Sequence, residues 1–374
     1  MRIAFVGCGY VGDFYIQSLP NHRELELVGV YDRDEERCMR FSAHYGTRTY
    51  GALEELLSDP NVELVVNLTN PRSHYEISKA ALERGKHVYS EKPLAMHIEQ
   101  ARELVEIAEK NRLLLASAPC NVLSETAQTI WKVLREGRIG QARLAYAHMD
   151  AGMIFSNYKE WYSKSGAQWP FDDEFETGCT LEHVGYYLGW LTAFFGPALR
   201  VSSFGAVLND GKGSSADCAT PDYTVGSIEF VSGQVARITC GLYGPRDHSL
   251  KIFGDDGVLS VDDCWDYHSK VFVENRQPKT WREKHPRRAL TLGLGRPKIP
   301  LVRERKFAYC SNGSRSDWCR GIAEQAEAVA EKRESRLSGR WSLHVNELAL
   351  AISNGYSGPI QSTFEPMKPM PWAL

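Results

Sequence analysis

The sequence predicts an α/β protein: an N-terminal Rossmann domain with a parallel sheet, followed by an α+β domain with a large, open, mostly antiparallel sheet. Strand-like and helix-like patterns alternate over residues 1–120, which is typical of βαβ units. A glycine-rich run at 7–12 lies between the first strand and the first helix. After residue 120 the strand-like patterns follow one another. Because 374 residues exceed one ordinary core, we expect one domain at 1–120 and a second at 121–374.

The elements of the first domain follow from short apolar runs and amphipathic stripes. The helix expected at 97–110 has the clearest stripe, with apolar residues from Ile98 to Ala108 on one side and charges on the other. The expected strands are 2–6, 25–31, 62–68, 86–89 and 113–116, and the expected helices are 10–19, 34–45, 72–84 and 97–110.

The second domain should begin with a helix at 122–136. Ser232-Gly233 lies between two strand patterns and predicts a hairpin. Residues 158–175 are rich in Trp and Tyr, and residues 275–306 show no periodicity, which favours an extended arm. The other expected elements are strands 142–150, 199–208, 223–231, 234–243, 248–253 and 257–261, and helices 178–195, 316–332 and 341–353.

Composition narrows the class of protein. The net charge of −3 gives no chain-wide field that would favour nucleic acid or an anionic membrane. No run of about 18 apolar residues predicts a membrane span, and the first strand begins at Arg2, which leaves no room for a signal peptide. The nine cysteines are odd in number and lack CxxC spacing, which argues against a disulfide framework and a zinc site. We expect a cytoplasmic protein with reduced thiols and without metal, nucleic-acid or membrane partners.

The glycine-rich run matches the motif that binds a dinucleotide, because each glycine has a physical role in that motif. The first glycine allows a tight turn, the second lets the backbone approach a pyrophosphate, and the third lets the helix pack against the strand. Asp32 ends the second strand, where its carboxylate would bind the ribose hydroxyls and favour NAD, whereas Arg33 could neutralise a 2′-phosphate and leaves NADP open. The cofactor-binding residues expected here are Gly7, Cys8, Gly9, Tyr10, Val11, Gly12, Asp32 and Arg33.

A second motif, Glu91-Lys92-Pro93, follows the strand at 86–89, at the edge where open α/β sheets bind ligands. An ammonium there would lower the pKa of an alcohol and stabilise the developing alkoxide. Pro93 would orient Lys92, and a cis peptide bond is allowed. We expect Thr69, Asn70, Pro71, His74, Glu91 and Lys92 to contact the cofactor, with a capping or packing role as the alternative for His74. The two motifs together predict a nicotinamide-dependent oxidoreductase.

On these residues the chain resembles the glucose–fructose oxidoreductase / inositol dehydrogenase / rhizopine catabolism (Gfo/Idh/MocA) family. The resemblance implies a Rossmann domain and then an α/β domain whose open sheet forms the interface of a homodimer or homotetramer. It also implies oxidation or reduction of a sugar or cyclitol hydroxyl. The residues that carry it are Gly7 to Gly12, Asp32, Thr69 to His74, Ala81 to His87, and Glu91-Lys92-Pro93.

The resemblance also implies a second catalytic element, in which an acid, a glycine and a histidine follow at intervals of two on the helix after the aromatic segment. When the family's pattern is aligned through the Phe-Phe-Gly-Pro sequence downstream, its three positions fall on Glu182, Val184 and Tyr186. A tyrosine therefore replaces the histidine. Glu182 and Tyr186 share one helix face, and His183 lies about 100° away from Glu182. Three interpretations stay open: Tyr186 is the acid/base with its pKa lowered by Lys92, His183 is the acid/base, or Tyr186 only binds substrate while Lys92 acts through water.

Further substrate contacts are expected beside this helix. Asn121 takes the place of the family's arginine and could bind a sugar hydroxyl or the nicotinamide amide, or else cap the helix at 122–136. The aromatic segment offers flat faces for a sugar ring and hydroxyl partners in Lys159 and Asp173; the alternative is a packed loop cover or an oligomer contact. The substrate-binding residues expected are Lys92, Asn121, Lys159, Trp161, Trp169, Glu182 and Tyr186.

The segment 276–306 carries eleven Lys or Arg residues against two Glu residues. We expect a solvated or inter-subunit arm, with a clamp for an anionic substrate as the alternative.

The function predicted from these features is an NAD-dependent dehydrogenase or reductase, with NADP left open. It would act on a secondary hydroxyl, or the matching ketone, of a cyclitol, a sugar or a sugar derivative, including phosphorylated or nucleotide-linked ones. Two alternatives remain: a redox-neutral lyase or glycosidase with tightly held NAD, and a non-catalytic dinucleotide sensor.

Overall fold

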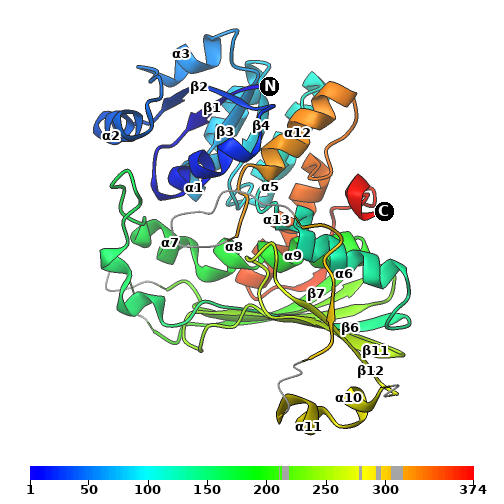
Figure 1. Ribbon diagram of the computed structural model, residues 1–374. Helices are drawn as coiled ribbons and strands as arrows, with labels where there is room; N and C mark the ends of the chain where they lie inside the picture. The colour runs from blue at the N-terminus through cyan, green and yellow to red at the C-terminus, as the bar shows by residue number, and fades with distance from the viewer. Residues whose placement is uncertain (210, 213–218, 278–279, 292–295, 305–314) are drawn as a thin grey trace.

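A computed structural model describes residues 1–209, 211–212, 219–277, 280–291, 296–304 and 315–374. The chain forms two sheets that lie one above the other, with a layer of helices between them (Figure 1). None of the helices in the described ranges is long and apolar enough to cross a membrane.

The first sheet has five parallel strands in the order β2-β1-β3-β4-β5, which confirms the expected Rossmann arrangement. Its central strand β3 is buried along its whole length, so helices must cover both faces of the sheet. The sequence did not predict the short helix α3. The strands are β1 (Arg2–Val6), β2 (Glu26–Tyr31), β3 (Leu64–Asn67), β4 (His87–Ser90) and β5 (Leu115–Ser117), and the helices are α1 (Tyr10–Ser18), α2 (Glu35–Tyr45), α3 (Leu53–Ser58), α4 (His74–Glu83) and α5 (Ile98–Asn111).

The second sheet has nine strands in the order β13-β12-β11-β10-β6-β9-β8-β7-β14. All its pairs are antiparallel except β6 with β9, so the expected open, mostly antiparallel sheet is confirmed. β8 and β9 form the predicted hairpin, whereas β12 and the two edge strands β13 and β14 were not predicted. The strands are β6 (Ala142–Asp150), β7 (Ala198–Ala206), β8 (Tyr223–Phe230), β9 (Val235–Gly241), β10 (Leu250–Gly254), β11 (Gly257–Val261), β12 (Val271–Asn275), β13 (Lys298–Ile299) and β14 (Ser357–Pro359).

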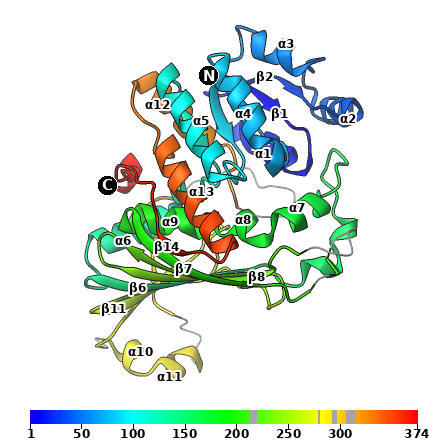
Figure 2. The same cartoon turned by 180° about the vertical axis from the view of Figure 1, so that it is seen from behind.

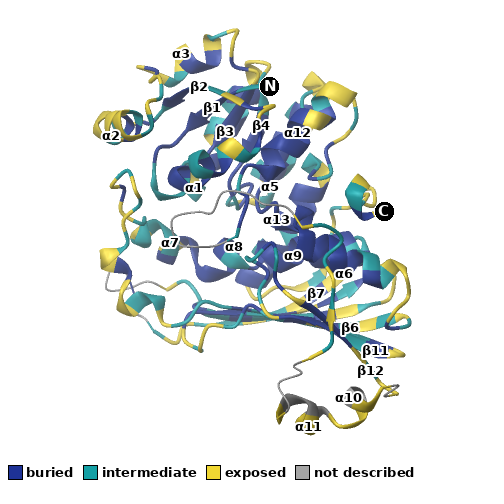
Figure 3. Ribbon diagram, viewed as in Figure 1, coloured by how far each residue is buried: buried dark blue, intermediate teal, exposed yellow. Residues whose placement is uncertain are grey.

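Helices cover only one face of this sheet. Figure 3 shows buried helices above the strands and part-exposed residues on the face below. Along β6 the burial alternates: Ala145, Ala147 and Met149 are buried beneath the helices, and Tyr146 and His148 lie on the open face. The helices of the middle layer are α6 (Glu125–Arg135), α7 (Phe171–Thr177), α8 (Cys179–His183), α9 (Gly185–Phe195) and α13 (Gly339–Ser353).

The helix predicted at 178–195 is observed in two pieces, because Val184 separates α8 from α9. The aromatic segment before it contains the 3₁₀ turn at Tyr158–Glu160 and the start of α7, a helix that the sequence did not predict. The 3₁₀ turns among the described residues are Leu19–Asn21, Pro71–Ser73, Asn121–Leu123, Ile154–Ser156, Tyr158–Glu160 and Pro371–Ala373.

The C-terminal helices return to the first sheet, as Figure 2 shows from behind. In α12 (Arg320–Glu331), the Gln325 amide donates to the carbonyl oxygens of Val88 and Leu114, at 3.0 and 2.8 Å. In α13, Ser342 accepts a hydrogen bond from the Ser117 N–H at 3.1 Å. A domain boundary at residue 120 therefore stays a prediction, and the chain after it also packs on the first sheet.

The basic segment is not a plain extended arm. It forms α10 (Trp281–Lys284) and α11 (Pro286–Thr291), which project beyond the sheet near β12 (Figure 1). The expectation of an irregular arm is wrong for these residues, because each short helix is interrupted before a clear helical period develops in the sequence.

Candidate active site

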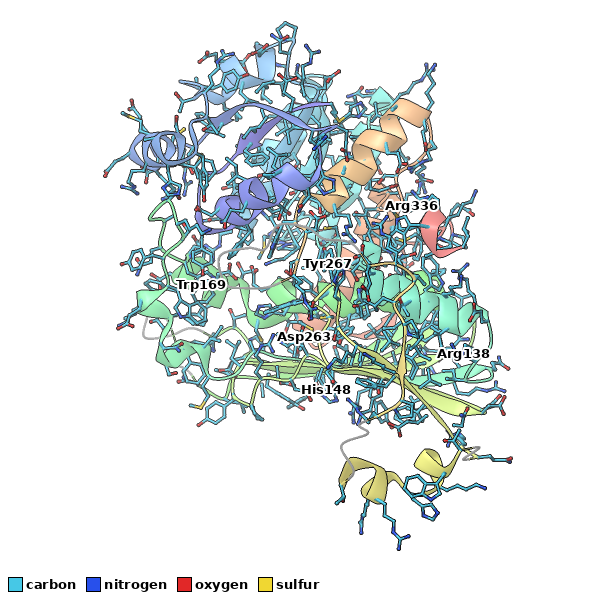
Figure 4. The ribbon with its side chains drawn as sticks, in the orientation of Figure 1. Arg138, His148, Trp169, Asp263, Tyr267 and Arg336 are labelled. Carbon is cyan, nitrogen blue, oxygen red and sulfur yellow. The ribbon has the colours of Figure 1, made fainter. Side chains whose placement is uncertain are left out.

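The cleft lies between the carboxyl ends of the first sheet and helices α7 to α9, with a volume of about 1640 Å³. It runs from the glycine-rich loop, past Lys92 and α8, to loops beyond β9 and β11. Figure 4 shows Trp169 at one side of this region and Asp263 and Tyr267 nearer its middle.

The glycine-rich loop has the geometry that a dinucleotide pyrophosphate needs. Gly7 has φ +105°, and a Cβ there would lie 2.5 Å from the Leu68 carbonyl oxygen, so no other residue fits. At Gly9, nothing lies within 4 Å of where a Cβ would be, and the residue lines the cleft with Tyr10 and Val11. Backbone N–H groups at the start of α1 can thus approach a phosphate closely.

Asp32 is nearly buried and holds the glycine-rich loop. Its carboxylate accepts hydrogen bonds from the Cys8 N–H at 2.8 Å and the Asp34 N–H at 2.9 Å. Arg33 is exposed and does not line the cleft, whereas Arg37 and Arg40, one and two helical turns later, do. The sequence analysis named Arg33 and missed these two, because the side of α2 that faces the cleft depends on how α2 packs.

His74 connects the loops after β3 and β4. Its ring nitrogens lie 2.8 Å from the Thr69 carbonyl oxygen and 2.7 Å from the Pro93 carbonyl oxygen, and burial lowers its pKa. The packing alternative therefore describes its contacts, although the residue also lines the cleft with Thr69, Asn70 and Pro71.

Lys92 lies at the centre of the cleft, and its peptide bond to Pro93 is cis. Its ammonium forms an ion pair with the Glu182 carboxylate, which brings together two candidates ninety positions apart. Burial acts to lower the pKa of Lys92, but Glu182, Glu174 and Glu91 outweigh it and raise that pKa well above its usual value. Glu91 is held in turn by the Tyr15 hydroxyl, which donates to it at 2.6 Å.

Glu174, on α7, is a site residue that the sequence analysis missed. Burial, and then the neighbouring Glu182 carboxylate, raise its pKa well above the usual value, and the Lys92 ammonium acts in the opposite direction. In the sequence it ends an acidic run, Asp172-Asp173-Glu174, which resembles a solvated helix start. Nothing in that run distinguishes Glu174 from its exposed neighbour Asp172.

The expected lowering of the Tyr186 pKa is wrong. Burial raises the pKa of Tyr186 above its usual value, and the opposing effect of Lys92 is smaller. Lys92 has already formed an ion pair with Glu182, and the phenol ring is buried against Trp265 with ring centroids 5.5 Å apart. Tyr186 is therefore a protonated phenol at neutral pH.

His183 also faces the cleft, as a neutral imidazole. Burial, Lys92 and His248 lower the pKa of His183 to about 3. Its Nδ1 is buried and has no hydrogen-bond partner among the described residues. Its ring centroid lies 5.7 Å from that of Trp265.

Asn121 is buried at the edge of the cleft and positions α9. Its amide donates to the carbonyl oxygens of Tyr186 and Cys264, each at 3.3 Å. The capping alternative is wrong, because Ser124 caps α6 by accepting a hydrogen bond from the Ala127 N–H at 3.1 Å.

The aromatic segment contributes two of its expected residues. Trp161 and Trp169 line the cleft with ring centroids 5.1 Å apart, and Asp173 bonds to the Asn70 amide. Lys159 is exposed and does not line the cleft, so its expected contact with substrate is wrong. The 3₁₀ turn at Tyr158–Glu160 directs that side chain outwards, which spacing alone does not reveal.

The described residues of segment 276–306 do not support the alternative of a clamp for an anionic substrate. None of them lines the cleft; Arg296 pairs with Asp262 and Arg303 with Glu125. Lys279, Arg305 and Lys306 lie outside the described residues.

The far wall of the cleft was not predicted. It contains Arg246 and His248 from the chain between β9 and β10, and Asp263 and Trp265 from the chain after β11. These residues lie in irregular segments without periodicity, so only the fold brings them together. In the described part of the chain no group of three His, Cys, Asp or Glu residues could hold a metal ion.

Comparisons with known proteins agree with this architecture. A family model described as "Oxidoreductase family, NAD-binding Rossmann fold" matches residues 1–118, and the "GFO/IDH/MocA C-terminal domain" matches residues 127–260. Trans-1,2-dihydrobenzene-1,2-diol dehydrogenase from Macaca fascicularis is 25% identical over 334 residues, which cover 82% of this chain and 94% of that protein. An uncharacterized oxidoreductase from Synechocystis is 26% identical over 283 residues, 71% of this chain and 73% of that protein.

Solved structures share the whole fold. The WlbA dehydrogenase from Bordetella pertussis, crystallised with NADH and UDP-GlcNAcA, matches with a TM-score of 0.72 at 20% identity, over 96% of this chain and 98% of that one. UDP-N-acetylglucosamine 3-dehydrogenase from Acidithiobacillus ferrooxidans matches with a TM-score of 0.68 at 19% identity, over 95% and 97%.

Proposed function

Because the chain belongs to the Gfo/Idh/MocA family of NAD-binding oxidoreductases, we propose that it transfers a hydride between the nicotinamide and a secondary hydroxyl, or the matching ketone, of a ring-shaped sugar, sugar derivative or cyclitol. The observation that carries the proposal is the Lys92–Glu182 ion pair. It lies at the carboxyl end of β4, in one cleft with the glycine-rich loop and Tyr186. The names of the relatives support an alcohol on a ring, since they include a dihydrobenzenediol dehydrogenase and a sugar 3-dehydrogenase.

The residues present suit the dinucleotide. Gly9, Tyr10 and Val11 would hold the pyrophosphate, and Thr69 to Pro71 would lie along the nicotinamide ribose. The nicotinamide, when bound, supplies the hydride acceptor or donor. The protein's own side chains act on the substrate oxygen and its proton.

Lys92 is placed to control that oxygen. Its ammonium stabilises negative charge on the alcohol oxygen as the C–H bond breaks. Lys92 can accept the alcohol proton while it passes one of its own to Glu182, so the proton moves from substrate to carboxylate. Tyr186, as a protonated phenol, donates a hydrogen bond to the same oxygen. This assignment corresponds to the substrate-binding interpretation of Tyr186, with the ion pair as proton acceptor.

Lys92→Met tests the proposal. The variant should bind NADH, measured by its fluorescence, but lose on the order of 10²–10⁴ in kcat, because the lost interaction acts on the transition state. Wild-type enzyme with an active polyol should show net formation of reduced nicotinamide. Lys79→Met is a matched control, since Lys79 pairs with Glu103 outside the cleft. Undiminished turnover in Lys92→Met, or product without net change in the nicotinamide, would overturn the proposal.

A further inference from the structure

We infer that Glu174 carries the substrate's proton from the Lys92–Glu182 ion pair to solvent. The inference rests on the proposed function, since it completes the path of the proton that an alcohol loses on oxidation. It goes beyond that function by assigning a role to a residue of α7 that no motif in the sequence indicated.

The turn at Gly178 brings the two acids to the same cleft. Gly178 lies between α7 and α8 with φ +92°, and a Cβ there would lie 2.4 Å from Thr220 Cγ2, so a larger residue would strain the turn. The Gly178 N–H donates to the Glu174 carbonyl oxygen at 2.9 Å, and the Glu182 N–H donates to the Gly178 carbonyl oxygen at 3.2 Å. Glu174 and Glu182 therefore line the same cleft from the two sides of one turn.

The carboxyl groups of Glu174 and Glu182 are close enough to share one proton. Glu182 forms its ion pair with Lys92 through Oε2, and its Oε1 is buried without a hydrogen-bond donor among the described residues. The Glu174 carboxyl group lies within hydrogen-bonding distance of Glu182; burial and this neighbour raise the pKa of Glu174, and Lys92 opposes the rise. Two adjacent carboxylates are costly when both are ionised, so a proton held between them stabilises the pair.

The cleft holds more acid than the ion pair needs. Three carboxyl groups, those of Glu182, Glu174 and Glu91, act on the single Lys92 ammonium. Glu91 accepts hydrogen bonds from the Tyr15 hydroxyl at 2.6 Å and from the Lys92 N–H at 3.0 Å, which gives it a structural role. Within the described ranges, no ion pair holds Glu174. A half-buried acid without a cation of its own costs stability, so its place beside the ion pair indicates a role in the reaction.

Exposure sets the direction of the path. Glu182 is 2% exposed, so a proton that reaches it from Lys92 has no direct contact with water. Glu174 is partly exposed and lines the cleft, so it connects Glu182 with solvent. Its raised pKa also makes Glu174 a better proton acceptor than an ordinary carboxylate.

The protons and electrons balance along this path. During oxidation the alcohol C–H bond breaks and its electron pair leaves as hydride to the nicotinamide, while the O–H proton passes to Lys92. Lys92 gives one of its own protons to Glu182, Glu182 gives it to Glu174, and Glu174 releases it to water. All three side chains return to their starting protonation states, and one proton enters solution for each ketone formed.

Infrared spectroscopy tests the shared proton without turnover. Purified full-length protein at neutral pH should show the C=O stretching band of protonated carboxyl groups, and Glu174→Gln should reduce its intensity. The matched control is Glu176→Gln, which should leave the band unchanged. Glu176 belongs to the same helix but is exposed and pairs with Arg72 outside the cleft. An unchanged band in Glu174→Gln would overturn the inference.

Turnover tests the path itself. The probe is whichever of myo-inositol, D-glucose and trans-cyclohexane-1,2-diol the wild-type enzyme oxidises fastest with NAD. Glu174→Ala should lose about 10- to 10²-fold in kcat, less than a group that contacts the substrate, and its solvent deuterium isotope effect should increase because proton release becomes rate-limiting. Glu174→Asp should retain part of the rate, and sodium formate, a small carboxylate, should restore part of it to Glu174→Ala. Glu176→Ala should show neither the loss nor the response to formate.

The outcomes separate this inference from the proposed function. An unchanged kcat in Glu174→Ala, or a loss without a larger isotope effect and without rescue by formate, overturns the relay. If no probe reduces NAD although NADH binds, the proposed function is wrong and the relay with it, while the infrared result still decides whether the two acids share a proton. If Glu174→Ala does not fold, as its melting temperature would show, the isotope effect of Glu174→Gln decides the question.

Discussion

Tyr186 illustrates how far a single residue's chemistry depends on burial. Its place on the helix, one turn after Glu182, was visible in the sequence, and both residues do line the cleft beside Lys92. Its protonation state was not visible, because the sequence does not reveal that the phenol is buried or that Glu182 neutralises Lys92. The sequence did not indicate Glu174, His248 and Trp265 either, because their neighbours in the cleft are distant in the chain.

Tyr186→Phe should therefore reduce activity only moderately. Removing a neutral hydrogen-bond donor costs about 0.5–1.5 kcal/mol, or roughly 2- to 12-fold in kcat/KM. The raised pKa also means that little phenolate forms below pH 10. If the oxidation rate rises between pH 6 and 10, that rise should therefore persist in Tyr186→Phe. The measurement is a pH–rate profile of both proteins. A loss of 10² or more in kcat, with such a rise removed, would identify Tyr186 as the acid/base.

We expect Asp32 to govern the choice of cofactor through its charge. Asp32→Asn keeps an acceptor for the Cys8 N–H but removes the repulsion of a 2′-phosphate, so the ratio of kcat/KM for NAD to that for NADP should fall about tenfold or more. Arg37, whose guanidinium would lose its ion pair with the Asp32 carboxylate, would then assist NADP. Asp34→Asn, at the cap of α2, serves as a control. A wild-type enzyme that already prefers NADP would contradict this role of Asp32.

The long elements were predictable and the connecting ones were not. The β1 to β5 strands and helix α5 have strong apolar patterns, so their existence and order followed from periodicity. Short elements such as α3, α7 and β14 have three to seven residues, too few for a period to show. The segment between β6 and α7 is such a case, and its path across the cleft depends on contacts with a distant helix.

The segment between β6 and α7 is hydrogen-bonded to α1 through Asp13. Asp13, buried at the start of α1, accepts hydrogen bonds from the Ser165 N–H at 2.9 Å and the Ser165 hydroxyl at 2.7 Å. Gly166 and Ala167, next in the chain, line the cleft together with Gly9 and Tyr10. We expect this segment to cover the part of the cleft beside the glycine-rich loop, where the dinucleotide would bind, and the Asp13 contact to hold it in place.

Asp13→Ala should release the cofactor faster. Hydrogen bonds to a charged acceptor contribute about 1.5–3 kcal/mol each, so the NADH dissociation rate should rise by at least ~10-fold. Stopped-flow displacement of NADH measures this rate. Ser165→Ala removes one of the two bonds and should act in the same direction with a smaller effect, while Glu103→Ala breaks a contact far from the cleft and should have none. An unchanged dissociation rate in Asp13→Ala would show that this contact does not retain the cofactor.

At the scale of the whole molecule, the open face of the second sheet is the main unexplained surface. Strands β8 and β9 carry apolar residues on both faces of the sheet. Ile228 and Ile238 are buried under the helices, and Val225 and Val235 lie on the open face. Phe204 on β7 is 59% exposed there. In Figure 1 the α10–α11 arm projects on the same side of the sheet. Exposed apolar side chains on an uncovered sheet face favour association with another subunit.

We expect a dimer or tetramer formed through this face, and sedimentation at micromolar concentration should detect it. Phe204→Glu places a charge in the expected interface, where an unpaired buried charge is costly, so the variant should shift towards the monomer. Its melting temperature should then depend less on protein concentration than that of the wild type, because dissociation no longer accompanies unfolding. Met39→Glu introduces the same charge at a residue that is 60% exposed on α2, away from the sheet, and should leave the assembly intact. A wild-type monomer, or an oligomer equally disturbed by both variants, would show that subunits do not meet at the open sheet.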